Sequence, residues 1–99
     1  MKKTTLFRKL INSPEILQLP CCHDALSARV LEQAGFKAIS AAGYGTAGST
    51  LGFPDIGLAT ATEMINNYRH ICNAVAIPVF VDIDTGFGDV NNAIRAVQD

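Results

Sequence analysis

Apolar and polar positions along the chain follow two different periods, which predicts helices separated by short strands. Apolar residues recur every three or four positions in four segments, as on the buried face of an amphipathic helix. Asp24 is placed to cap one of these helices, and Thr60 with Glu63 forms a capping-box pair that opens another. The predicted helices cover residues 4–12, 24–35, 60–75 and 91–99.

Between the helices lie three short apolar runs that predict strands, at 16–22, 36–43 and 78–84, although Pro20 weakens the first of these predictions. A glycine-rich connection without apolar periodicity, residues 43–58, follows the second run. Strands that alternate with helices predict a parallel sheet with right-handed crossovers. Periodicity alone leaves two architectures open, a doubly wound sheet and a (β/α)₈ barrel.

Composition narrows the class of protein. The chain is 48% hydrophobic and 17% charged with a net charge of −1, which gives no electrostatic reason to expect nucleic acid or membrane binding. No apolar run approaches the roughly 20 residues that cross a bilayer. The 3 cysteines form no C-x-x-C pair, which favours a reducing cytoplasm. The 99 residues read as part of one domain without an internal linker.

Two aspartates, Asp82 and Asp84, stand near the end of the third apolar run. Residues two apart in a strand face the same side, so both carboxylates are expected on one face with Phe80. Like charges placed together there favour a hard divalent cation such as Mg²⁺ between them. The alternative is structural: one aspartate caps the next helix and the other pairs with an arginine.

The connection 43–58 carries further candidates. Gly43 and Gly45 leave backbone amides open to a carboxylate or phosphate, since they bring no side chain. Asp55 follows a Phe-Pro pair and could direct a third carboxylate into the same site, or could simply occupy a turn. Loops of this length in compact domains are usually functional or mobile.

Three motifs in this order, HDALSARVLEQAGFKAI, LGFPDIGLATATEM and IPVFVDIDTGFGD, resemble the phosphoenolpyruvate mutase / isocitrate lyase superfamily. The resemblance covers nearly the whole chain and implies a (β/α)₈ TIM barrel. The chain would supply an N-terminal helix and about the first three βα units. Since the last predicted helix reaches Asp99 without a cap, the chain is expected to be an N-terminal fragment of a longer protein.

The resemblance also implies site residues. Asp82 and Asp84 match the family's D-x-D-T-G-[YF]-G metal motif, which implies Mg²⁺, with Mn²⁺ as an alternative ion. Asp55 matches an aspartate near metal and substrate, which makes it the catalytic candidate. The segment from Ala42 to Gly45 corresponds to backbone that holds a substrate carboxylate, often Ser-Gly-Gly in the lyases. Here Ala42 lacks that hydroxyl and Tyr44 adds a phenol.

The activity implied is a Mg²⁺-dependent lyase or decarboxylase, similar to methylisocitrate lyase. Such an enzyme cleaves a C–C bond of a small 2-hydroxy- or 2-oxo-dicarboxylate through a pyruvate-enolate-like intermediate. A phosphonomutase acting on a phosphoenolpyruvate-type substrate is the first alternative, and an inactive truncated fragment is the second. The lyases' Lys-Lys-Cys-Gly-His loop has no match here. By analogy the full protein is expected to be a cytoplasmic homo-oligomer, commonly a homotetramer, whose partner is a small carboxylate.

Overall fold

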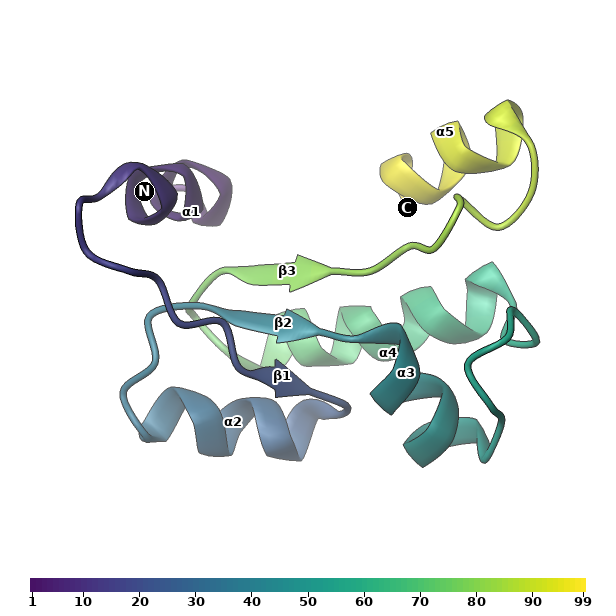
Figure 1. The fold of residues 1–99 in the computed structure, drawn as a ribbon, viewed down its shortest axis with the longest axis horizontal. Helices are drawn as coiled ribbons and strands as arrows, with labels where there is room; N and C mark the ends of the chain where they lie inside the picture. Colours follow the sequence, from purple (N-terminus) through teal and green to yellow (C-terminus); the bar gives the residue numbers. More distant parts are fainter.

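Three short parallel strands lie at the centre of the structure, a computed structural model that describes residues 1–99 (Figure 1). The strands are β1 (Cys21–Cys22), β2 (Ile39–Ala41) and β3 (Val79–Val81), and they pair in the order β1-β2-β3. In register, Cys22 pairs with Ala41 and Ala41 pairs with Val81. The parallel sheet expected from the strand–helix alternation is thereby confirmed.

The helices surround this sheet, and each predicted helix is present within one or two residues at its ends, α2 ending two residues short. Asp24 caps α2 and accepts a hydrogen bond from the Ser27 backbone N–H at 2.7 Å. Thr60 caps α4, where the predicted capping box with Glu63 is formed in both directions. The helical elements are α1 (Lys3–Asn12), α2 (Ala25–Gln33), α3 (Gly43–Gly45), η1 (Thr46–Leu51, a π-helix), α4 (Ala61–Ala74) and α5 (Val90–Gln98).

The buried core lies on one face of the sheet, between the strands and the two crossover helices α2 and α4. Ile39 of β2 and Ile71 of α4 are its largest fully buried apolar side chains. The opposite face carries Cys21, Ser40 and the half-exposed Phe80, which the ring of Phe7 from α1 approaches to 6.0 Å between centroids. A doubly wound sheet has helices on both faces, whereas a barrel has them only outside. The two crossover helices, α2 and α4, lie on the same face of the sheet, as the outer helices of a (β/α)₈ barrel do.

The strands are shorter than the sequence predicted. The paired segments hold two or three residues each, so most of the runs 16–22, 36–43 and 78–84 is irregular. Pro20 has no N–H to donate, but its carbonyl accepts the Ser40 N–H at 2.9 Å and continues the ladder by one bond. Apolar runs predicted the positions of the strands correctly, and their lengths wrongly.

The expectation of a long loop over 43–58 is wrong for its first half. Residues 43–51 are helical, as α3 continued by η1, and the helix ends at Gly52 in a left-handed conformation with φ of 69°. Thr46 and Ala47 are buried, and the Thr46 hydroxyl donates to the Ala42 carbonyl at 3.0 Å. Burial of this face stabilises a helix that the three local glycines alone disfavour.

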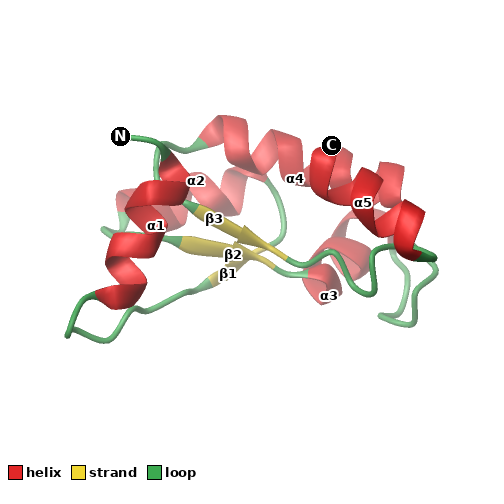
Figure 2. Ribbon diagram, turned by 90° about the horizontal axis from the view of Figure 1, so that it is seen from above, coloured by secondary structure: helices red, strands yellow, loops and turns green.

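The helices differ in where they lie along the strands. Seen from above, α1 lies towards the start of the strands, and α3 and α5 lie beyond their ends (Figure 2). The chain therefore gathers its post-strand segments at one end of the sheet. No helix combines the length and the apolar character that crossing a membrane requires.

Candidate functional site

The candidate site lies at the carboxyl ends of the three strands. Because the strands are parallel, the residues that follow them meet at one edge: His23 after β1, Ala42 and Gly43 after β2, and Asp82 after β3. Barrels place their active sites at this edge. The residues expected to bind metal and carboxylate thus come from two adjacent strand ends.

Asp82 and Asp84 lie beyond the strand rather than within it. The paired strand ends at Val81, although the Asp82 N–H still donates to the Ala41 carbonyl at 3.3 Å. Phe80, Asp82 and Asp84 are all exposed, and the residues between them are half-buried, so the expectation that the three share one face stays a prediction. Asp84 has a positive φ of 52°, and its N–H donates to Oδ1 of Asp82 at 2.8 Å. This turn breaks the alternation of a strand and fixes one oxygen of Asp82.

The turn after β2 fits between the ends of the other two strands because it carries glycines. A Cβ atom on Gly43 would lie 2.9 Å from Oδ2 of Asp82. A Cβ atom on Gly45 would lie 3.2 Å from Cβ of His23. Backbone from β2 therefore approaches the Asp82 carboxylate directly, and any side chain at position 43 would displace it.

Asp55 lies on an exposed turn between η1 and α4. It makes no ion pair, and no three histidine, cysteine, aspartate or glutamate side chains lie close enough to form a metal cluster. The expectation that Asp55 joins Asp82 and Asp84 stays a prediction. The structure provides two neighbouring carboxylates rather than a complete set of protein ligands around a metal ion.

Tyr68 of α4 is the buried neighbour of these carboxylates. Its side chain is 4% exposed, and its hydroxyl donates to the backbone carbonyl of Asp82 at 2.6 Å. Burial raises the pKa of the Tyr68 phenol, and the negative charges of Asp82, Asp84 and Asp55 add to the rise. The phenol therefore stays protonated and remains a hydrogen-bond donor.

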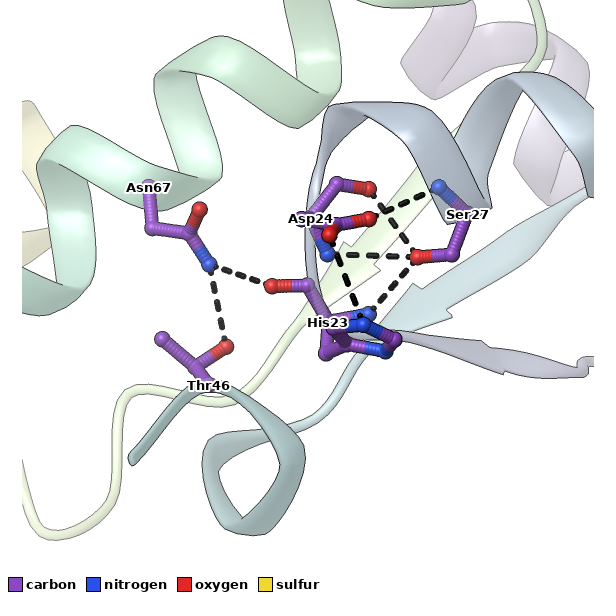
Figure 3. A network of polar contacts seen from close by, with 5 residues as sticks. All are labelled: His23, Asp24, Ser27, Thr46 and Asn67. Carbon is purple, nitrogen blue, oxygen red and sulfur yellow. Dashed lines mark hydrogen bonds and ion pairs between the residues drawn. The ribbon is translucent and has the colours of Figure 1, made fainter. Parts of the chain in front are cut away.

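A second polar group, on the β1 side of the site, connects α4 to the strand ends (Figure 3). The Asn67 amide donates to the His23 carbonyl at 2.8 Å and lies 3.3 Å from the Thr46 hydroxyl. Nearby, Ser27 hydrogen-bonds to Asp24 through its backbone N–H and its hydroxyl, and these bonds lower the pKa of the Asp24 carboxyl. Asp24 is thus a helix cap, as expected.

The sequence pointed to the carboxylates and glycines but not to Tyr68, Asn67 or Thr46. Tyr68 and Asn67 bond to residues far along the chain. The bond of Thr46 to Ala42 depends on a helix that the glycines there did not predict. One signal was available for Tyr68: its position on the apolar face of α4 buries the phenol, and a buried hydroxyl needs a partner.

The donor set suits a hard divalent cation. Asp82 and Asp84 present carboxylate oxygens in an exposed position, with no lysine or arginine paired to either. Mg²⁺ typically takes one or two protein carboxylates and keeps several waters. The residues present therefore fit Mg²⁺ better than a metal that needs nitrogen or sulfur ligands.

Comparison with known proteins places these features in a family context. The sequence profile described as phosphoenolpyruvate phosphomutase matches residues 7–99. The chain is 39% identical to 2,3-dimethylmalate lyase of Eubacterium barkeri over 99 residues, covering 100% of the chain and 34% of that protein. It is 44% identical over 96 residues to the chloroplastic carboxyvinyl-carboxyphosphonate phosphorylmutase of Arabidopsis thaliana, covering 96% and 28%.

Similarity to solved structures supports the same family. A phosphonopyruvate hydrolase in complex with oxalate and Mg²⁺ superposes with a TM-score of 0.89 at 31% identity, over 98% of the chain and 34% of that structure. The chain spans about a third of the length of the proteins it matches. The similarity covers all three strand ends described above.

Proposed function

Because the chain belongs to the phosphoenolpyruvate phosphomutase family, we propose that it forms the ion-binding part of a Mg²⁺-dependent lyase or decarboxylase. The substrate would be a small 2-hydroxy- or 2-oxo-dicarboxylate that is cleaved at a C–C bond. The observation that carries this proposal is the contact between the exposed Asp82 carboxylate and the bare backbone of Gly43. It puts a cation-binding oxygen beside backbone that could receive an anionic substrate.

In this proposal Asp82 and Asp84 hold the ion, directly or through water. The hydrogen bond from the Asp84 N–H to Oδ1 of Asp82 orients that carboxylate before any ion binds. When bound, Mg²⁺ would act as a Lewis acid that lowers the energy of negative charge developing on a substrate oxygen. Both aspartates lie on a turn that needs no rearrangement to present them to solvent.

The turn from Ala42 to Gly45 would bind the substrate carboxylate. The first N–H groups of a helical segment have no acceptor within it, so those of Gly43 and Gly45 are available to an anion. Tyr44 is 75% exposed and would contact the substrate through its phenol. Asp55 is proposed as the catalytic carboxylate that contacts the substrate from the neighbouring turn.

Neither Cys22 nor Cys72 suits a role as a nucleophile in this site. Burial raises the pKa of the Cys22 thiol to about 11, and burial also raises the pKa of Cys72.

A phosphonomutase is the second candidate, and the 44% identity to the Arabidopsis thaliana phosphorylmutase favours it. The same ion and anion sites would then receive a phosphoenolpyruvate-type substrate. We also propose that the intact protein is a homo-oligomer in the cytoplasm, with a small carboxylate as its partner.

The test is an assay of the intact protein, including any chain that accompanies residues 1–99 in the cell. It would be incubated with Mg²⁺ and either 2,3-dimethylmalate and related 2-hydroxydicarboxylates or phosphonopyruvate. The lyase proposal predicts release of a 2-oxo acid, detected by a coupled dehydrogenase, that EDTA abolishes. Phosphorus NMR showing P–C bond chemistry without C–C cleavage would favour the mutase instead. Metal-independent turnover of either substrate class would contradict both.

A further inference from the structure

Two adjacent residues of α4, Asn67 and Tyr68, hydrogen-bond to the ends of two different strands. The Tyr68 hydroxyl donates to the Asp82 carbonyl, just after β3, at 2.6 Å. The Asn67 amide donates to the His23 carbonyl, just after β1, at 2.8 Å (Figure 3). A single turn of one helix therefore fixes the outer two of the three strand ends relative to each other.

The middle strand end is connected to the same turn through Thr46. The Asn67 amide lies 3.3 Å from the Thr46 hydroxyl, which in turn donates to the Ala42 carbonyl at 3.0 Å. Thr46 is fully buried, and no buried side-chain nitrogen or oxygen in the chain lacks a hydrogen-bond partner. Satisfied polar groups in a core are rigid, because breaking one bond leaves a buried group unpaired.

From these contacts we propose that Tyr68 is a positioning residue for the Asp82 carboxylate, supported by Asn67. Three hydrogen bonds hold Asp82: its N–H donates to the Ala41 carbonyl at 3.3 Å, its carbonyl accepts from the Tyr68 hydroxyl, and Oδ1 accepts from the Asp84 N–H. The bond from Tyr68 is the one that ties the Asp82 backbone to α4. Without it, only the bond to Ala41 would hold this backbone, and the turn that carries both aspartates would be less constrained.

Packing alone does not explain a tyrosine at this position. Phenylalanine would fill the same core space with Met64 and Ile71 and would bury no hydroxyl. The hydroxyl is used here for a bond to the Asp82 carbonyl. The inference rests on the proposed role of Asp82 in holding the ion.

The experiment is a titration of the intact protein with Mn²⁺, followed by the loss of the free-ion EPR signal. Tyr68→Phe should weaken Mn²⁺ binding about tenfold, the lower end of the loss seen when partners behind metal ligands are removed. Ile71→Val is the control, since it lies one turn along the same buried face and carries no polar group. It should lower stability without changing Mn²⁺ affinity.

Asp82→Asn separates this inference from the proposed function. If Asp82→Asn abolishes Mn²⁺ binding while Tyr68→Phe binds like the wild type, the positioning role is overturned and the ion site stands. If Asp82→Asn also binds like the wild type, or the wild type does not bind, both are overturned. Equal weakening by Tyr68→Phe and Ile71→Val would show that Tyr68 acts only through core stability, which also overturns the inference.

Discussion

Gly43 lies directly against the carboxylate of Asp82, with only 2.9 Å between the position of a Cβ atom on Gly43 and Oδ2 of Asp82. The two residues come from the ends of adjacent strands and are far apart in the sequence. No side chain fits between them unless the carboxylate moves. This contact makes the glycine a requirement of the site rather than of the fold.

Gly43→Ala should therefore reduce Mg²⁺-dependent turnover at least about tenfold while the protein stays folded. The new methyl group would push Oδ2 away and disturb the bond between Oδ1 of Asp82 and the Asp84 N–H. The backbone itself would tolerate alanine, because the position is helical and alanine is favoured over glycine there by about 1 kcal/mol. Turnover and thermal unfolding measured on the same samples would check both parts.

Gly48→Ala is the matched control for Gly43→Ala. Gly48 lies in the same helical segment, and a Cβ atom there would meet nothing within 4 Å. It should stabilise the protein slightly and leave turnover unchanged. Equal turnover of the two variants would contradict the proposed contact.

The turn that leads into α5 should be sensitive to a side chain at Gly86. Gly86 has φ of 95°, and its Cβ would lie 2.5 Å from Cβ of Ala93, so Gly86→Ala adds an overlap to backbone strain. Gly35 has nearly the same φ, 98°, but a Cβ atom there would meet nothing within 4 Å. Gly35→Ala therefore measures the backbone strain without the overlap. We expect Gly35→Ala to cost about 1 kcal/mol and Gly86→Ala to cost about 1–3 kcal/mol more.

Chemical denaturation of the intact protein would measure both glycine variants. Similar losses for Gly35→Ala and Gly86→Ala would mean that α5 shifts freely and that Ala93 does not pack tightly against the turn. A larger loss for Gly86→Ala would show that α5 is anchored next to the aspartates.

The Asp24 cap should make part of the free energy of unfolding depend on pH. Hydrogen bonds from the Ser27 backbone N–H and hydroxyl lower the pKa of Asp24 in the folded state. A carboxyl with a lowered folded pKa stabilises the fold above its unfolded pKa of about 4, and this stabilisation is lost as the pH falls through the folded pKa. Asp24→Asn keeps a good capping residue and should therefore unfold with a weaker pH dependence below about pH 4.

Urea unfolding at a series of pH values would follow this change. Ser27→Ala removes the hydroxyl but keeps the backbone donor, so it should show an intermediate pH dependence. If the free energy of unfolding of Asp24→Asn fell with acid as steeply as that of the wild type, Asp24 would be excluded as a source of the pH dependence.

Much of the helical framework could be predicted from local chemistry. Asp24, the Thr60–Glu63 pair and Gly35 are signals that act within a single turn, and each has the predicted role. The strand positions followed from apolar runs, because burial against α2 and α4 needs such residues. What failed were predictions that depend on neighbouring strands, such as how many residues of each run are paired.

The candidate site residues came from the sequence, but the shapes of the turns that carry them did not. The strand was expected to reach Asp84, whereas it ends at Val81 and Asp84 has a left-handed backbone, which no β-strand pattern predicts. The helix over 43–51 was missed because its glycines indicate a loop, while buried contacts of Thr46 and Ala47 decide the outcome. Tyr68 and Asn67 were missed because their partners are distant in sequence.

The central claim is that Asp82 and Asp84 hold a divalent ion, and calorimetric titration of the intact protein with Mg²⁺ tests it most directly. Asparagine is the right substitution, since it tolerates the left-handed φ of 52° at Asp84. Asp89→Asn is the control, because Asp89 is an exposed cap of α5 and asparagine caps equally well. The account predicts one Mg²⁺ per chain, lost in Asp82→Asn and Asp84→Asn and kept in Asp89→Asn. Unchanged Mg²⁺ affinity in both of the first two variants would contradict it.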